Sequence, residues 1–396
     1  MRRFIETSYM TPSLHCFNAT ERISFGESAA SAVVKELDRT GSQRVFVLGS
    51  RSVAATPSYQ AIVQALGDRF VGQFTGITAH VPQACVLEGA QAARAARADV
   101  LLAIGGGSVI DATKIMLVAL KNDLSTPAQL HEAAVFAASD GSVRPADAAQ
   151  WLRMIAVPTT LSAAEFTWFA GCSDTTAGVK EIFGYPMTAP RAVIVDPLVT
   201  LDTPMNLFLS SGIKAVDHAA EFMAMLNVDP CVDAFGTAAL KLLSEGLPRV
   251  LANPLDLDAR LDCQRGMAMS IRILEFGARV GASHAIGHVF GAHAGVGHGY
   301  TSCVLLPAVM RYNKVVNASK QKMIAQAMGC EGMEAADAIE QLVRNLNLPT
   351  RIRDVGVKRE DFQVIADKVM HDFGIKNNPR PVTHTSQLLE ILESAW

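Results

Sequence analysis

The sequence predicts an α/β nucleotide-binding domain, a parallel sheet with helices on both faces, followed by an all-α domain. In the first half, short runs of aliphatic and β-branched residues alternate with alanine-rich helical stretches, as in parallel sheets with crossover helices. From about Met205 onward the strand signals vanish and only helical periodicity remains. The 396 residues also exceed one average domain. We therefore expect an α/β domain over residues 1–203 and a helical domain over residues 204–396.

Local patterns predict the elements of each half. The segments "RVFVLG" (44–49), "DVLLAIG" (99–105), "RMIAVPTT" (153–160) and "RAVIVDP" (191–197) indicate strands, and "VLEGAQAARAARA" (86–98), opened by Pro82, indicates a helix. Residues 122–150 are expected to form a surface excursion. Beyond "DPLVTLDTPM" (196–205), helical periodicity marks residues 212–226, 233–251, 261–280 and 334–348.

Composition excludes several classes of protein. The net charge is only −3 and no long basic run occurs, so the footprint of a nucleic-acid binder is absent. No stretch reaches the ~18 apolar residues of a membrane helix, and the N-terminus lacks the apolar region of a secretory signal. The seven cysteines are scattered and never form a C-x-x-C pair, which predicts neither structural zinc nor disulfides. We expect a cytoplasmic protein with a small-molecule substrate.

Two turns after strands are candidate ligand-binding turns. In "LLAIGGGSVIDATK" (101–114) three glycines and Ser108 lie between a strand and a helix, so backbone amides at the helix start can face a phosphate. The pattern is not the G-x-G-x-x-G of an ordinary dinucleotide fold. The second turn, "VPTTLSAAE" (157–165), carries three hydroxyls, which by themselves indicate helix caps as readily as ligands. Parallel sheets bind ligands where their strands end, which favours the ligand reading for both turns.

A histidine-rich segment raises the question of a metal. Residues 281–299, "GASHAIGHVFGAHAGVGHG", hold four of the chain's ten histidines. His284 and His288 are one helical turn apart, and His298 follows ten residues later. This spacing is compatible with a metal site, a proton relay or a histidine-lined pocket without metal.

Four motifs in register resemble one family. "GGGSVIDATK", "PTTLSAAE", "GIKAVDHAAE" and "HAIGHVFGAHAGVGHG" are similar in order and spacing to the group III, iron-containing alcohol dehydrogenases, and the likeness extends from about residue 20 to "NPRP" near the end. That superfamily includes glycerol dehydrogenases, maleylacetate reductases and, more remotely, dehydroquinate synthases. The resemblance implies an N-terminal nucleotide-binding domain, a helical C-terminal domain, an active site in the cleft between them, and at least a homodimer.

The resemblance also implies site residues. NAD or NADP would lie over the glycine turn and along the second turn, with further contacts from the first helix and from a later lysine. The cofactor residues carried over are Gly106, Gly107, Ser108, Asp111, Thr159, Thr160, Ser162 and Lys180. If a metal ion, Fe or Zn, were bound, its histidine ligands would be His218, His284 and His298, with His288 close to substrate and cofactor.

The fourth ligand of the family is missing. The family pattern G-x-D-A-x-x-H-A-x-E is "GIKAVDHAAE" here, so Lys214 replaces an aspartate four residues before His218. Asp217 is not an obvious substitute, because one residue along a helix rotates a side chain by ~100°. Glu221 is a possible replacement ligand, although it matches a family glutamate. Three neutral imidazoles beside an ammonium hold a dication poorly, which predicts loss of the metal unless Lys214 extends out of the cleft.

This departure resembles the maleylacetate reductase-like branch, whose members lack the aspartate, although they do not usually carry lysine there. A metal-free mechanism follows from the residues. Lys214 would stabilise a developing alkoxide or bind a substrate carboxylate, while His288 or His284 would deliver a proton. We assign His293 to the rim, and interpret His15, His80, His131, His371 and His384 as isolated structural or exposed residues.

Cofactor choice is suggested by the end of the first predicted strand. Relatives that prefer NAD often carry an aspartate there, whereas "VLGSRS" puts Ser50 at that place with Arg51 beside it. Loss of the carboxylate permits NADP, and Arg51 could pair with its phosphate; a capped turn with an exposed arginine is the simpler alternative.

The sequence therefore predicts an NAD(P)-dependent oxidoreductase for a small, carboxylated carbonyl or alcohol, in which Lys214, His218, His284, His288 and His298 line the reaction site. The alternative is a metal-dependent alcohol dehydrogenase. More remote alternatives are a dehydroquinate synthase-like lyase, for which no dense Lys/Arg cluster is found near the histidines, and a binding protein with a decayed site.

Overall fold

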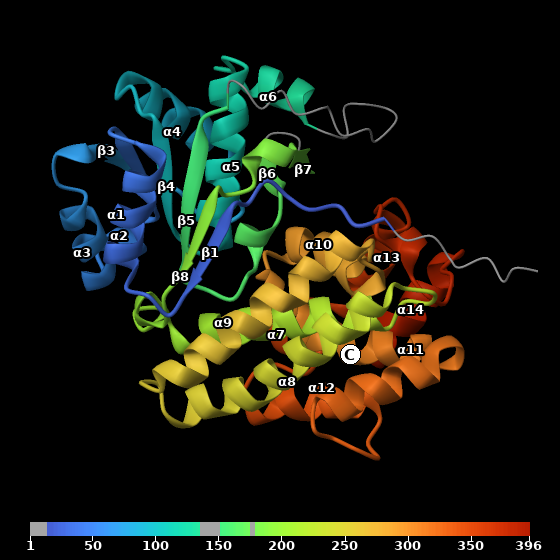
Figure 1. The fold of residues 1–396 in the computed structure, drawn as a ribbon. Helices are drawn as coiled ribbons and strands as arrows, with labels where there is room; N and C mark the ends of the chain where they lie inside the picture. The colour runs from blue at the N-terminus through green and yellow to red at the C-terminus, as the bar shows by residue number, and fades with distance from the viewer. Residues whose placement is uncertain (1–13, 135–150, 175–178) are drawn as a thin grey trace, which may run out of the picture.

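The computed structural model describes residues 14–134, 151–174 and 179–396. Its main sheet has six parallel strands in the order β1-β8-β5-β4-β2-β3. They are β1 (Arg22–Phe25), β2 (Val45–Leu48), β3 (Phe70–Phe74), β4 (Val100–Gly105), β5 (Arg153–Pro158) and β8 (Ala192–Val195). Together with a helical C-terminal part, this sheet confirms the predicted fold class (Figure 1).

Helices cover both faces of the sheet. The helices of this half are α1 (Ala29–Thr40), α2 (Arg51–Ala54), α3 (Pro57–Ala65), α4 (Gln83–Ala95), α5 (Gly107–Lys121) and α6 (Pro127–Ala133). Alternate residues of a strand point to opposite faces, so Val45 and Val47 pack with α1 and α3, whereas Phe46 and Leu48 pack with α4 and α5. The four predicted strands are confirmed as β2, β4, β5 and β8. All four are buried, as their apolar runs predict.

Some elements were missed by the sequence analysis. Strands β1 and β3 lie at the sheet edges and are only partly buried, so their sequences lack a continuous apolar run. A separate antiparallel pair, β6 (Phe169–Asp174) and β7 (Val179–Gly184), was also missed. The excursion expected over 122–150 is partly wrong: α6 lies within it and buries Leu130, while residues 135–150 fall outside the described residues.

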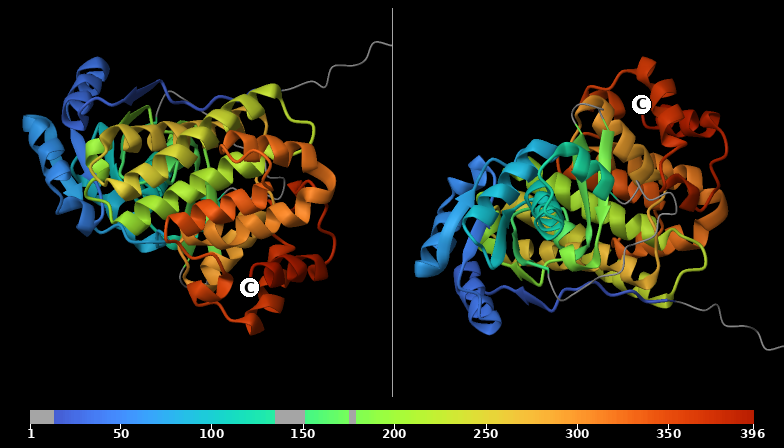
Figure 2. Two further views of the ribbon diagram at one scale, coloured as in Figure 1. Left: turned by 90° about the horizontal axis from the view of Figure 1, so that it is seen from below. Right: turned by 90° about the horizontal axis from the view of Figure 1, so that it is seen from above.

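The C-terminal half consists of packed helices, as predicted. They are α7 (Met205–Met223), α8 (Pro230–Ala252), α9 (Leu257–Arg272), α10 (Ala282–Ala294), α11 (His298–Ala327), α12 (Ala335–Asn345), α13 (Phe362–Val369) and α14 (Thr385–Ser394). The helix expected over 261–280 ends earlier, at Arg272, and a short 3-10 turn leads to Gly277 at φ 87°. Seen from below, the helical half lies in front of the sheet, and seen from above the sheet half lies in front of the helices (Figure 2).

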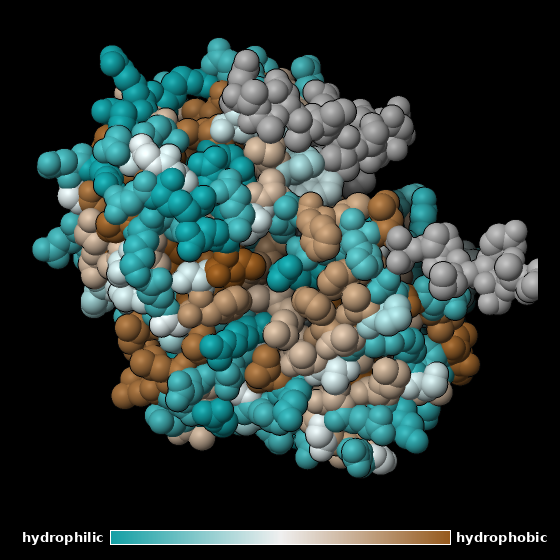
Figure 3. Space-filling model, viewed as in Figure 1, coloured by the Kyte–Doolittle hydropathy of each residue, from teal (hydrophilic) through white to brown (hydrophobic). Residues whose placement is uncertain are grey.

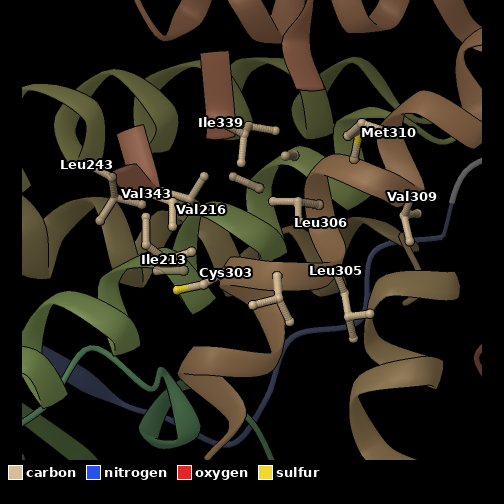
Figure 4. Packing of buried hydrophobic residues seen from close by; sticks show 14 of the residues in the cluster. Ile213, Val216, Leu243, Cys303, Leu305, Leu306, Val309, Met310, Ile339 and Val343 are labelled. Atoms are coloured by element: carbon tan, nitrogen blue, oxygen red, sulfur yellow. The ribbon is translucent and has the colours of Figure 1, made fainter. Parts of the chain in front are cut away.

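Helix α7 is central to this half. It packs against α8, α9 and α11, and its Ile213 and Val216 join a core that includes Leu243, Leu306 and Val343 (Figure 4). On the outer face seen in Figure 3, apolar side chains lie in small groups among hydrophilic ones. Within the described ranges, no helix is long and apolar enough to cross a membrane.

The start of α11 lies directly against α7. A Cβ added to Gly299 would come within 2.6 Å of the backbone carbonyl carbon of Ser210, closer than any real side chain can be. The glycine thus lets two helices approach at the point where α11 carries His298 and α7 leads to Lys214.

We expect Gly299→Ala to lower the free energy of unfolding by about 1–3 kcal/mol, because backbone atoms must separate to admit the methyl group. Urea unfolding of the purified chain measures this change. The matched control is Gly297→Ala, where an added Cβ meets nothing within 4 Å; it should cost less than about 1 kcal/mol. Equal losses in the two variants would contradict the close-packing explanation.

Candidate active site

The two predicted ligand-binding turns lie side by side. Strands β4 and β5 are neighbours, and the Thr159 amide donates to the Gly105 carbonyl oxygen at 3.1 Å. A Cβ on Gly106 would lie 2.9 Å from Thr160 Cγ2, and one on Gly107 would lie 3.0 Å from Ser162 Oγ. The second turn therefore packs on the first so closely that neither glycine can carry a side chain without movement.

Polar atoms at this junction fit a phosphate group. Gly106 is the N-cap of α5. The first amides of this helix with a backbone hydrogen bond are those of Val109 and Ile110, and both donate to the Gly106 carbonyl oxygen. The preceding amides, including that of Ser108, are those that a helix leaves free at its positive end. Within the described part of the chain, the buried hydroxyls of Thr160 and Ser162 also have no hydrogen-bond partner. Unsatisfied buried hydroxyls are costly, so these atoms fit a polar ligand such as a dinucleotide.

Ser50 lies at the end of β2, where the simpler interpretation, a capped turn, describes its contacts. Its Oγ accepts from the Val53 amide at 3.3 Å and caps α2. Arg51 is exposed and forms no ion pair among the described residues.

The β6–β7 hairpin lies between α5, which begins at the glycine turn, and the site histidines. Asp111 on α5 accepts from the Gly171 amide of β6 at 3.2 Å. The side chain of Lys180 on β7 crosses over Gly171, where an added Cβ would lie 2.2 Å from Lys180 Cε. Its Nζ is 3.2 Å from His298 Nε2. Thus the expected cofactor residue Lys180 touches a residue from the histidine set.

The four predicted site histidines form one row. The ring centroids of His218 and His284 are 5.0 Å apart, and His288 is 6.3 Å from both His284 and His298. His218 and His284 are buried, whereas His288 keeps 30% of its side chain exposed. His293 is exposed and pairs with Asp361 at 3.4 Å, outside the row, which agrees with its assignment to the rim.

Lys214 lies inside the site. Only 15% of its side chain is exposed, and its Nζ is 3.6 Å from Asp217 Oδ2, so it does not extend away into solvent. Asp217 also accepts from Ser302 Oγ at 2.6 Å and lies 3.9 Å from His284 Nδ1. Asp217 thus lies inside the site despite its ~100° rotation from His218. Three residues along a helix return a side chain to nearly the same face, which brings Asp217 beside Lys214.

Glu221 supports His284. Its Oε1 accepts from the Ser283 amide at 2.7 Å, and its Oε2 is 2.6 Å from His284 Nδ1. Burial and the charge of Asp217 raise the pKa of Glu221 to about 8. Because Nδ1 of His284 contacts Glu221, its Nε2 is the ring nitrogen left for the site. Glu221 therefore orients this imidazole.

The donor set has features both for and against a tightly bound iron or zinc ion. Burial and the charge of Lys214 lower the pKa of His284 to about 3, and both effects also lower the pKa values of His218 and His298, which keeps these imidazoles in the neutral form that binds metals. The third imidazole of the implied ligand set, that of His298, has its Nε2 3.2 Å from the Lys180 ammonium. Ligand atoms of Asp217, Glu221 and His284 do lie within 4.8 Å of one another. However, Lys214 and Ser302 both contact Oδ2 of Asp217, whereas its Oδ1 has no hydrogen-bond partner among the described residues. Two ammonium groups near these ligand atoms repel a dication.

Several relevant residues were missed from the sequence. Lys114, although part of the glycine motif, was given no role; it is fully buried and donates to the carbonyl oxygens of Ala164 and Phe169 at 2.6 and 2.7 Å. Burial lowers its pKa to about 8. Glu165 is also fully buried, and within the described ranges both its carboxylate oxygens lack a hydrogen-bond partner. The charge of His80, interpreted as isolated, contributes to the lowered pKa of His298.

Two family models together match almost the whole chain. Residues 20–197 match the model of iron-containing alcohol dehydrogenase, and residues 208–396 match that of the Fe-containing alcohol dehydrogenase family, C-terminal. Dehydrogenase ALT3 of Alternaria alternata is 31% identical over 90% of this chain and 99% of its own. Maleylacetate reductase 1 of Cupriavidus pinatubonensis is 29% identical over 94% and 93% of the two chains.

Solved structures agree with this result. A putative alcohol dehydrogenase from Ralstonia eutropha JMP134 has a TM-score of 0.83 at 26% identity and covers 98% of both chains. A maleylacetate reductase from Rhizobium sp. strain MTP-10005 has a TM-score of 0.80 at 25% identity, over 98% of this chain and 99% of its own. The predicted resemblance, including its maleylacetate reductase-like branch, is confirmed.

The buried Glu165 predicts a pH-dependent stability. Burial raises its pKa from 4.5 to about 7. A carboxyl with a raised folded-state pKa stabilises the fold below pH 4.5, and this contribution is lost as the pH rises through 7. Relative to the native chain, Glu165→Gln should therefore gain about 1–3 kcal/mol of unfolding free energy between pH ~5 and pH ~8.

Urea unfolding across this pH range measures the gain. The control is Glu88→Gln, at an exposed carboxylate on α4, which should show no such trend. A difference between Glu165→Gln and the native chain that does not change with pH would mean that Glu165 is already charged in the fold.

Proposed function

Because the chain belongs to the iron-containing alcohol dehydrogenase family, and is thus an oxidoreductase, we propose that it reduces a small carboxylated carbonyl compound with NADH or NADPH, without a bound metal. The single observation that carries the proposal is the Lys214 ammonium, which lies among the family's histidines and is paired with Asp217 at 3.6 Å. The domains 1–203 and 204–396 are part of the proposal, supported by the passage from β8 to α7 between them.

The cofactor is held mainly by the two turns. Gly106, Gly107 and Ser108 offer amides to the diphosphate, and Thr160 and Ser162 offer their unpartnered hydroxyls. Thr159 fixes the second turn against β4, while Asp111 and Lys180 extend toward the histidine row. Ser50 lies at the adenosine side, where no carboxylate repels a 2′-phosphate. When bound, the nicotinamide supplies the hydride.

Lys214 provides the positive charge that a metal would otherwise supply. A developing alkoxide is stabilised best by a charge already in place in a site that excludes water. Lys214 meets this condition, because it is largely buried and fixed by Asp217. Lys180, beside His298, supplies a second cation for a substrate carboxylate.

The proton comes from the histidine row. His284 is buried with its Nδ1 against Glu221, and His218 is buried behind it. His288 is partly exposed and can exchange a proton with solvent, so we assign proton delivery to His288 rather than His284. The reduction then balances: the hydride adds to the carbonyl carbon and the proton adds to its oxygen.

One observation favours the metal-dependent alternative. In the described part of the chain, His218 Nδ1 and His284 Nε2 are buried without a hydrogen-bond partner, as free ligand nitrogens would be. That function requires an ion to bind beside Lys214, so metal content separates the two candidates.

We expect protein purified without an affinity tag to hold less than about a tenth of an equivalent of Fe or Zn, because the ammonium groups oppose a dication. Mass spectrometry measures the metal, and NADH or NADPH oxidation with maleylacetate and small aldehydes is compared with and without chelator. Turnover should resist the chelator. Near-stoichiometric metal that is lost together with activity would establish the metal-dependent alternative. Lys214→Asp, which restores a carboxylate, should increase zinc uptake.

We expect Lys214→Met to lower kcat/KM for maleylacetate or a small aldehyde about 10²–10³-fold, because the negative charge that develops on the carbonyl oxygen as hydride adds loses its fixed positive partner. NADH affinity, measured by fluorescence titration, should change less than about twofold if the cofactor turns are intact. The control is Lys241→Met, at an exposed lysine on α8 that pairs only with Glu245 among the described residues. A fully active Lys214→Met enzyme would exclude Lys214 from the mechanism.

A further inference from the structure

We propose that Asp372 positions His288 for proton delivery, so that a carboxylate–imidazole pair, contributed partly by the C-terminal segment, completes the site. The inference rests on the proposed function, because it deepens the assignment of His288. Asp372 lies 84 residues after His288 and was not a candidate from the sequence.

The contact is direct and well supported. Asp372 Oδ2 is 3.0 Å from His288 Nδ1, and its Oδ1 accepts from the Gly374 amide at 2.8 Å. The carboxylate is therefore held by its own chain, with 12% of the side chain exposed. Gly374 in turn packs on the start of α10, where an added Cβ would lie 3.3 Å from the Gly281 carbonyl oxygen. These contacts fix Asp372 relative to the helix that carries His288.

This pairing decides which nitrogen of His288 does chemistry. A carboxylate only accepts, so it keeps a proton on Nδ1 and leaves Nε2 as the nitrogen that exchanges one. The ring of Phe373 lies 5.8 Å from that of His288 at 30° and restricts its rotation. The rings of His284 and His298 and the ammonium of Lys180 face the same space. During reduction, Nε2 gives its proton to the alkoxide oxygen, and solvent replaces it.

No other histidine of the row combines these features. His284 is paired with a carboxylate but buried, and the Nε2 of His298 faces Lys180. In the described residues, His288 alone among the four has both a carboxylate on Nδ1 and substantial exposure.

The same helix supplies a matched control. His293, also on α10, pairs with Asp361 at 3.4 Å, and this pair lies outside the row. It pairs with its aspartate through Nε2 rather than Nδ1 and is similarly exposed, and no ring contact among the described residues joins it to the other histidines. Removing either aspartate breaks a histidine–aspartate pair between α10 and the C-terminal segment. If Asp372 only stabilised the fold, activity should therefore fall in both variants.

The kinetic test uses maleylacetate and NADH with the full-length chain. Asp372→Ala should lower kcat about 10- to 100-fold with KM and NADH affinity little changed, because orientation and not binding is lost. Asp372→Glu should recover part of the loss, and Asp361→Ala should retain the native kcat. Equal kcat values for Asp372→Ala and the native enzyme, or equal losses in both alanine variants, would overturn the proposal.

A second measurement does not depend on turnover. Histidine side-chain ¹⁵N NMR, assigned with His288→Gln, reports which ring nitrogen carries the proton. We expect Nδ1 in the native protein and a shift to Nε2 in Asp372→Ala, with His288 unchanged in Asp361→Ala. A native His288 protonated on Nε2 alone would overturn the proposal even if turnover is normal. If no carbonyl compound is reduced while the expected tautomer is found, the proposed function fails and the Asp372–His288 pair stands.

Discussion

The site depends on the turn over residues 159–163, which is wedged between α5 and α7. On one side Thr160 and Ser162 pack on Gly106 and Gly107, and on the other the Leu161 amide donates to Ser211 Oγ at 3.0 Å. The turn that we propose to face the cofactor is therefore hydrogen-bonded to the helix that carries Lys214 and His218. Hydride transfer requires reacting atoms at near-contact distance, so a rigid link between the two halves is a precondition of the chemistry.

The second constraint is the balance of buried charge. Removing ions from water costs several kcal/mol each unless partners compensate. Lys214 and Asp217 compensate each other, and the Ser302 hydroxyl satisfies part of the carboxylate. In the sequence pattern that this chain resembles, an aspartate stands at the position of Lys214, so the site here holds an ammonium beside the carboxylate of Asp217.

The sequence predicted the fold class, the central strands and the helical half, because long apolar runs and helical periodicity are local signals. It also predicted the two turns and the histidine row. It failed where position is set by distant packing. The contact of Asp217 with Lys214 was not foreseen, because the sequence argument compared Asp217 with His218 and not with Lys214, three residues earlier. Asp372 gave no signal, since its role depends on a contact across 84 residues. Strands β1 and β3 were missed because edge strands are not uniformly apolar.

The pairing of the first strand has a consequence for synthesis on the ribosome. Arg22 of β1 pairs with Ala192 of β8, which the ribosome adds 170 residues later. At about 5–20 residues per second, β1 waits on the order of 10–30 s for its neighbour. During that interval its backbone donors and acceptors are open to pairing with other nascent chains. Its short length and the flanking arginine and glutamates (Glu21, Arg22 and Glu27) make such pairing less favourable, so the charged ends of this strand protect the chain before it is complete.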